Sequence, residues 1–133
     1  MTRQYSDAVR DGWNNAYETG IGTAPVLELR TGAQPANCAA ADSGTLLASL
    51  TLPSDWQGAS SGGVSTKLGT WSGTAVAAGT AAHYRLKSSG GTCHEQGSVT
   101  ITGGGGDLTL DNPSIANGQA VVIATWTRTA PGA

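Results

Sequence analysis

After residue 22 the chain consists of short apolar runs separated by clusters of glycine, serine, asparagine and proline, and this pattern most narrows its possible folds. In 26–30 and 82–87, apolar and polar residues alternate, as in a strand with one buried and one wet face. The other strand candidates are 45–52, 64–68, 71–76, 93–102, 107–110 and 120–129. Seven or eight strands between frequent turns predict two packed antiparallel sheets.

The first twenty residues have a helical period instead. Apolar side chains recur there at every fourth position, at Tyr5, Val9, Trp13 and Tyr17. This spacing predicts an amphipathic helix over residues 3–18, with Thr2 as its N-cap and Gly20 after its last turn. The apolar stripe must be buried, either against the strands of the same chain or against a neighbouring subunit.

These two patterns predict an all-β fold: an antiparallel β-sandwich of the immunoglobulin-like or jelly-roll kind, preceded by one N-terminal amphipathic α-helix. A chain of 133 residues with 38% hydrophobic residues holds one modest core, so a second domain is not expected. We expect an N-terminal helical arm over 1–22 and a β-sandwich domain over 23–133.

The charge content argues against two classes of partner. Charged residues make up 12% of the chain and the formal net charge is −2. Seven scattered Lys and Arg residues cannot form the basic surface that neutralises many phosphates, so we expect no nucleic-acid partner. Apolar windows are too short for a membrane span, and the first residues lack the apolar segment of a signal peptide. We therefore expect no membrane partner and no signal-directed export.

The two histidines do not form a catalytic or metal-binding pattern. His83 alternates with apolar residues beside Arg85, which predicts a solvated position on the wet face of its strand. His94 stands between Cys93 and Glu95, whose side chains would point to the opposite face of a strand. The three therefore do not favour a shared metal site.

Motifs for nucleophilic or phosphate chemistry are also missing. The sequence has no Gly-x-Ser-x-Gly motif, and the glycine run at 103–106 is not followed by Lys-Ser or Lys-Thr. The glycine run is better interpreted as a flexible turn. We expect no enzymatic activity and no cofactor.

Two tryptophans are further candidates for an interface. Trp56 and Trp71 lie in or beside stretches rich in glycine and serine, where an exposed ring could stack on a sugar or fill a partner's pocket. The alternative is that both fill the core, which the absence of phenylalanine favours. We keep both residues as interface candidates together with the helical stripe.

The two cysteines permit at most one disulfide. Cys38 and Cys93 would close a loop of about 55 residues, which is long enough for a useful gain in stability. The alternative is two free thiols in a protein made in a reducing cytoplasm. The sequence leaves both alternatives open.

Four segments carry a resemblance to a known family. They are PVLELRTG at 25–32, PANC at 35–38, GTLLASLTL at 44–52 and LDNPSIANGQAVVI at 110–123. With the amphipathic helix, they make the chain resemble a family of small tailed-bacteriophage and prophage proteins, thought to be virion components encoded among the head and tail genes. The resemblance covers most of the chain, including the closing segment 108–129, and implies no catalytic residues.

This resemblance implies a protein of the virion, assembled in the host cytoplasm. The first expectation is a capsid decoration or cement protein that binds the major capsid protein lattice and forms homo-oligomers. One alternative is a ring component of the neck, collar or tail; another is a carbohydrate- or receptor-binding module that uses Trp56 and Trp71. A surface of small, uncharged side chains fits repetitive packing, because such side chains lose little rotamer freedom on contact.

Overall fold

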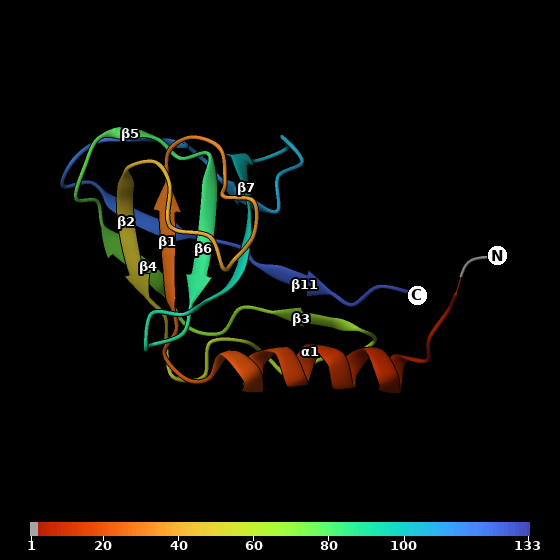
Figure 1. The fold of residues 1–133 in the computed structure, drawn as a ribbon. Helices are drawn as coiled ribbons and strands as arrows, with labels where there is room; N and C mark the ends of the chain where they lie inside the picture. Colours follow the sequence, from red (N-terminus) through yellow and green to blue (C-terminus); the bar gives the residue numbers. More distant parts are fainter. Residues whose placement is uncertain (1–2) are drawn as a thin grey trace.

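The computed structural model describes residues 3–133 and shows a mostly β chain with one helix, α1 (Asp7–Ile21) (Figure 1). The strands are β1 (Val26–Arg30), β2 (Leu46–Thr51), β3 (Val64–Thr66), β4 (Trp71–Thr74), β5 (Gly79–Thr80), β6 (His83–Lys87), β7 (Cys93–Ile101), β8 (Leu108–Leu110), β9 (Ser114–Ile115), β10 (Ala120–Ile123) and β11 (Thr127–Thr129). Five of them form a curled sheet in the order β2-β1-β6-β7-β8. The others form two-stranded ladders, β10 with β4, β11 with β3 and β5 with β9.

Each run predicted as a strand contains one, but the pairing is less regular than two antiparallel layers. The β7–β8 pair is parallel, with Val99 opposite Leu108, so the expectation of a wholly antiparallel arrangement is wrong there. The glycine-rich turn causes this. Its Gly106 N–H donates to Thr100 Oγ1 at 2.9 Å, which folds the turn back along β7 so that β8 enters in the same direction.

The predicted last strand, 120–129, is two strands with different partners. β10 pairs with β4, and β11 pairs with β3. The turn before β10 forms as predicted, with Gly118 in the left-handed region at φ 82°. Its two arms do not pair with each other, because β9 pairs with β5 instead.

The helix begins four residues later than expected. Ser6 is the N-cap, and its Oγ accepts a hydrogen bond from the Val9 N–H at 3.3 Å. The predicted cap, Thr2, lies outside the described residues. Ser6 supplies the same hydroxyl chemistry one turn further along, so the segment before it is extended rather than helical.

The helix also ends later than expected, at Ile21 instead of residue 18, and Gly22 takes the place after its last turn that was expected for Gly20. Gly22 has a φ of 91°, and its N–H donates to the Glu18 carbonyl at 3.0 Å. No helix within residues 3–133 is long and apolar enough to cross a membrane.

A chain of aromatic rings runs through the core. The centroid distances are 5.9 Å from Tyr17 to Trp56, 6.1 Å from Trp56 to Trp71, 5.5 Å from Trp71 to Trp126, and 5.7 Å from Trp126 to Tyr84. Trp56 and Trp71 are 0% exposed, so their interpretation as interface residues is wrong and the core alternative is confirmed. With no phenylalanine in the chain, the tryptophans supply most of the aromatic volume of the core.

The polar face of the five-stranded sheet is also buried, which contradicts the prediction of a solvated His83. We call this the covered face and define it by Glu28, Arg30, His83, Arg85 and Lys87. The loop between β1 and β2, residues 31–45, folds over it, and we call this segment the cover loop. His83 and Arg85 are each 1% exposed beneath it.

Side chains of the covered face bind the cover loop through its backbone. His83 Nδ1 donates to the Gly32 carbonyl at 2.8 Å, and Gln96 Nε2 on β7 donates to the Pro35 carbonyl at 2.6 Å. The loop is closed at its neck, where the Thr31 N–H donates to the Thr45 carbonyl at 3.1 Å. The loop backbone therefore satisfies one polar atom of each side chain, while His83 Nε2 and Gln96 Oε1 are buried without a hydrogen-bond partner among the described residues.

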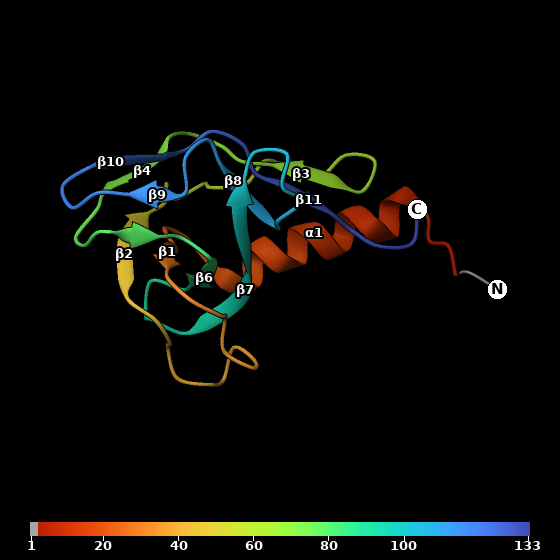
Figure 2. The same cartoon turned by 90° about the horizontal axis from the view of Figure 1, so that it is seen from above.

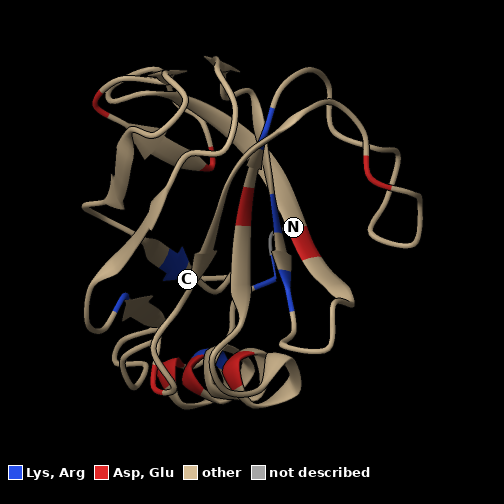
Figure 3. Cartoon of the chain, turned by 90° about the vertical axis from the view of Figure 1, so that its left-hand side faces the viewer, with Lys and Arg blue, Asp and Glu red and all other residues tan. Residues whose placement is uncertain are grey.

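Arg85 makes the largest share of these bonds. Its Nη1 donates to the Ala40 carbonyl at 3.0 Å and to Asp42 Oδ1 at 2.6 Å, and its Nη2 donates to the Cys38 carbonyl at 2.8 Å. Asp42 also accepts from Lys87 Nζ at 2.7 Å. Figure 3 shows residues of both charge signs on neighbouring strands here, while most loops carry none.

Candidate docking surface

The helix faces the strands with polar side chains. α1 lies alongside β3 and β11 (Figure 2), and Arg10 and Asn14, one turn apart, are buried between them. Arg10 donates to the Ala130 carbonyl from Nε at 3.2 Å and from Nη2 at 2.8 Å, and to the Gly62 carbonyl from Nη1 at 3.1 Å. Hydrogen bonds from a buried cation to backbone carbonyls therefore hold the helix in place.

Neighbouring residues extend this polar attachment. Asn14 Nδ2 donates to the Gly63 carbonyl at 2.9 Å and to Ser60 Oγ at 3.0 Å. Asp11 Oδ1 accepts from Ser60 Oγ and from the Gly63 N–H, each at 2.7 Å. These two hydrogen bonds, the one from Ser60 first, hold the pKa of the Asp11 carboxyl below its usual value.

Position 63 requires glycine for two reasons. Gly63 has a φ of 78°, in the left-handed region, and a Cβ there would collide with the Arg10 guanidinium. The guanidinium therefore packs directly on the backbone of the turn before β3. This close approach sets how the helix is rotated about its own axis.

Because the polar side faces inward, part of the apolar stripe faces outward. Tyr5 is 39% exposed, Val9 44% and Trp13 42%. The Tyr5 and Trp13 rings meet edge to face, with centroids 4.8 Å apart and planes at 68°. We call these three residues the outer stripe; they form a preformed aromatic and aliphatic patch that the described chain leaves uncovered.

The end of the chain fixes the position of Tyr5. The Tyr5 N–H donates to the Gly132 carbonyl at 2.7 Å. The Tyr5 ring lies so close to Gly132 that a Cβ at that position would collide with it. The aromatic pair is thus held by residues from both ends of the chain, although Tyr5 precedes the first helical turn.

Tyr17, the fourth residue of the predicted stripe, is not on this surface. Its ring packs on Trp56 in the core, and the Arg128 guanidinium lies 3.5 Å from its centroid on the other side. Burial raises the pKa of the Tyr17 hydroxyl far above its usual value. Tyr17 therefore belongs to the attachment of the helix.

Sequence reasoning missed the buried side of the helix. Arg10, Asn14, Tyr17 and Ile21 recur at intervals of four, three and four, which is itself a helical stripe. The predicted stripe took in Tyr17 but not Arg10 and Asn14, because a search for apolar residues at helical spacing passes over polar ones. The signal that could have revealed it is the aromatic and aliphatic continuation at Tyr17 and Ile21.

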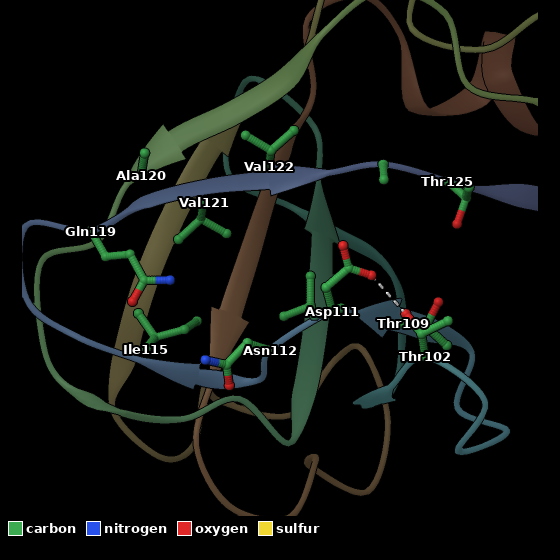
Figure 4. A pocket seen from close by; sticks show the side chains of 12 residues that line it. Thr102, Thr109, Asp111, Asn112, Ile115, Gln119, Ala120, Val121, Val122 and Thr125 are labelled. Carbon is green, nitrogen blue, oxygen red and sulfur yellow. Dashed lines mark hydrogen bonds between the residues drawn. The ribbon is translucent and has the colours of Figure 1, made fainter.

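A cavity of about 280 Å³ lies between β8, β9 and β10 (Figure 4). Its wall is mixed: half of the twelve lining residues are apolar, five carry a hydroxyl or amide group, and Asp111, which accepts from Thr102 Oγ1 at 3.1 Å, is the one charged residue. No histidine or cysteine lines it. The wall therefore offers hydrogen bonds without a paired nucleophile and base.

A second hollow, of about 210 Å³, is lined by residues that already pair with one another. Glu95 accepts from Tyr84 Oη at 2.8 Å and from Arg128 Nη1 at 2.5 Å. His94 is exposed on β7, and no group of three His, Cys, Asp or Glu residues among 3–133 is placed to hold a metal ion.

Comparison of the chain with protein-family models, curated proteins and solved structures finds no match in any of the three. The helix is thus the feature whose arrangement most needs a functional explanation. A chain that could have buried its aromatic stripe instead fixes that stripe on its surface.

Proposed function

We propose that this protein is a structural component of a tailed-bacteriophage particle, a capsid decoration or cement protein without enzymatic activity. The observation that supports the proposal is the outer stripe, an aromatic pair and a valine that are exposed together at the uncovered side of the helix. Tryptophan and tyrosine dominate protein interfaces, because they bury large areas at a low entropic cost. A partner that covers the outer stripe would bury the apolar surface that the fold of this chain leaves exposed.

The proposed partner is the assembled major capsid protein. A protein that binds only the assembled lattice stabilises it by mass action, because binding shifts the equilibrium away from separated subunits. The small net charge of −2 and the mostly uncharged loops (Figure 3) fit a position on the outer surface of a shell, away from packaged DNA. We also propose that copies associate with one another in the virion.

The body that carries the helix fits a support role. We propose that the curled sheet and the short ladders behave as one sandwich-like unit, since the aromatic chain from Tyr17 to Tyr84 links them through a single core. A rigid body would hold the outer stripe at a fixed orientation, and preorganisation lowers the entropic cost of binding.

A binding experiment with phage particles that lack the protein tests the proposal. The purified protein is added to the particles, and the bound copies are counted after sedimentation. We expect the Val9→Lys variant to lose about tenfold or more in affinity, because it places a charge at the centre of the covered stripe. Val76→Lys is the matched control, since Val76 is also an exposed valine but lies away from the helix. It should bind as the unmodified protein does.

The number of bound copies separates the capsid from the tail. Hundreds of copies per particle support a shell position, whereas about a dozen support the alternative of a ring at the neck, collar or tail, because such rings have fixed low symmetry. If particles bind no copies, or if Val9→Lys and Val76→Lys bind equally, the outer stripe is not the docking surface.

A further inference from the structure

The two cysteines meet at the boundary between the cover loop and the sheet. Cys93 is the first residue of β7, and Cys38 lies in the cover loop, 55 positions earlier. Their sulfur atoms are 2.8 Å apart, and both residues are free thiols. Both side chains are half-buried, so a small reagent can reach them.

Arg85 holds both cysteine segments in place while the thiols are reduced. Its Nε donates to Cys93 Sγ at 3.3 Å, and its Nη2 donates to the Cys38 carbonyl at 2.8 Å. One buried guanidinium thus fixes the cysteine on the loop against the cysteine on the strand. A bond between the sulfurs therefore requires little movement of the backbone.

We infer that Cys38 and Cys93 form a reversible disulfide that locks the cover loop onto the sheet when the protein meets a soluble disulfide such as oxidised glutathione. The thiolate of one cysteine attacks the soluble disulfide and releases one glutathione thiolate. The second cysteine, as a thiolate, attacks the mixed disulfide and releases the other. Two electrons pass from the cysteines to the glutathione, and the two protons of the cysteines go to the released thiolates.

The two states of this site differ in how the loop can move. With free thiols, the cover loop is held to the sheet by hydrogen bonds and by the ion pairs of Asp42, without a covalent link, and can open locally without unfolding the sheet. With the bridge, opening is prevented, because residue 38 stays attached to β7. A reducing cytoplasm favours the first state and an oxidising exterior the second. The inference concerns this chain alone and does not depend on capsid binding.

The pH of the solution should control the rate of closure. Burial, followed by a hydrogen bond with Cys93, raises the pKa of the Cys38 thiol to about 11. Because the thiolate is the reactive form, closure should become faster as the pH rises from neutrality toward this value.

The test is a titration of the purified full chain in mixtures of reduced and oxidised glutathione. We expect oxidation to lower the mass by about 2 Da, as expected for one internal bridge. Peptide mapping should then show Cys38 linked to Cys93. The melting temperature should rise by roughly 10 °C relative to the reduced protein. Cleavage of the cover loop by subtilisin should slow at least severalfold in the same samples.

Serine variants serve as controls. Cys38→Ser, Cys93→Ser and the double variant should show neither the rise in melting temperature nor the slower cleavage when oxidised glutathione is added. If the native chain gives only glutathione adducts or bridges between two molecules, the inference is wrong. It is also wrong if an internal bridge forms while cleavage of the cover loop is unchanged.

Discussion

The two faces of the five-stranded sheet are both buried, but by different means. On the inner face Leu27 lies opposite Leu86, and both pack into the core. On the covered face the next pair, Glu28 and Arg85, lies beneath a loop that these polar side chains help to hold. Alternation in a strand thus shows which side chains share a face, but not whether water or another segment covers it.

The physical cost of covering differs between the faces. Apolar side chains need only be removed from water, and any well-packed neighbour serves. Arg85 is almost completely removed from water, so its hydrogen bonds to water must be replaced by specific protein atoms, which lie in the cover loop and at Cys93. The inner face should therefore dominate the free energy of unfolding, while the covered face should determine the conformation of one loop.

The largest expected effect is on the inner side. Trp71→Ala leaves a cavity at the centre of the aromatic chain and should lower the free energy of unfolding by about 3–5 kcal/mol, measured by urea denaturation. Trp13→Ala, the same change on the outer stripe, should lower the free energy of unfolding by less than about 1 kcal/mol. Equal losses in the two variants would contradict the assignment of Trp71 to the core.

Arg85→Met should have a smaller and more local effect. The substitution leaves two loop carbonyls without their donor and removes one of the three cations that bind Asp42, which should lower the free energy of unfolding by about 2–3 kcal/mol. Because the loop can detach and be hydrated, we expect faster hydrogen exchange in 31–45 and unchanged exchange in β1. Faster exchange throughout the sheet would show that the two faces are not energetically separate.

Acid should weaken the covered face before the inner face. Hydrogen bonding from Lys87 and the charges of Arg30 and Arg85 hold the pKa of Asp42 below its usual value. A carboxyl with a lowered folded-state pKa contributes stability that is present above its unfolded value of about 3.9 and is lost as the pH falls further. The melting temperature of the unmodified protein should therefore approach that of Asp42→Asn as the pH falls below about 4. A constant gap between the two would contradict this role of Asp42.

The smallest expected effect is at the rim of the covered face. Lys87 pairs with Glu28 at 3.0 Å and with Asp42 at 2.7 Å, but both carboxylates also pair with Arg30 and so keep a cationic partner when Lys87 is replaced. Lys87→Met should lower the free energy of unfolding, measured by urea denaturation, by about 0–1 kcal/mol. A loss as large as that of Arg85→Met would show that the charged rim, and not the buried guanidinium, fixes the loop.

The sequence predicted where strands lie but not how buried polar residues are used. The runs at 26–30 and 82–87 predicted β1 and β6 almost residue by residue, because alternation is a local property. The positions of Arg10 and Arg85 could not be predicted in this way. Each buried guanidinium donates hydrogen bonds to carbonyl groups more than forty residues away in the chain. No local sequence pattern predicts such partners.

The same limit applied to the candidate docking surface. The spacing of Tyr5, Val9 and Trp13 predicted a shared face, but Tyr17 was grouped with them because it has the same period. Whether that face turns inward depends on the rotation of the helix, which Arg10 and Gly63 fix through a contact between distant segments. The exposure of Trp56 and Trp71 was misjudged for a related reason, since their flanking glycines suggested a surface loop.

The hydrogen bond between Tyr5 and Gly132 has a practical consequence for anyone who labels this protein. It holds Gly132 against Tyr5 of the outer stripe, so an affinity tag or fluorescent fusion joined directly after residue 133 would crowd the aromatic pair and could mask its binding.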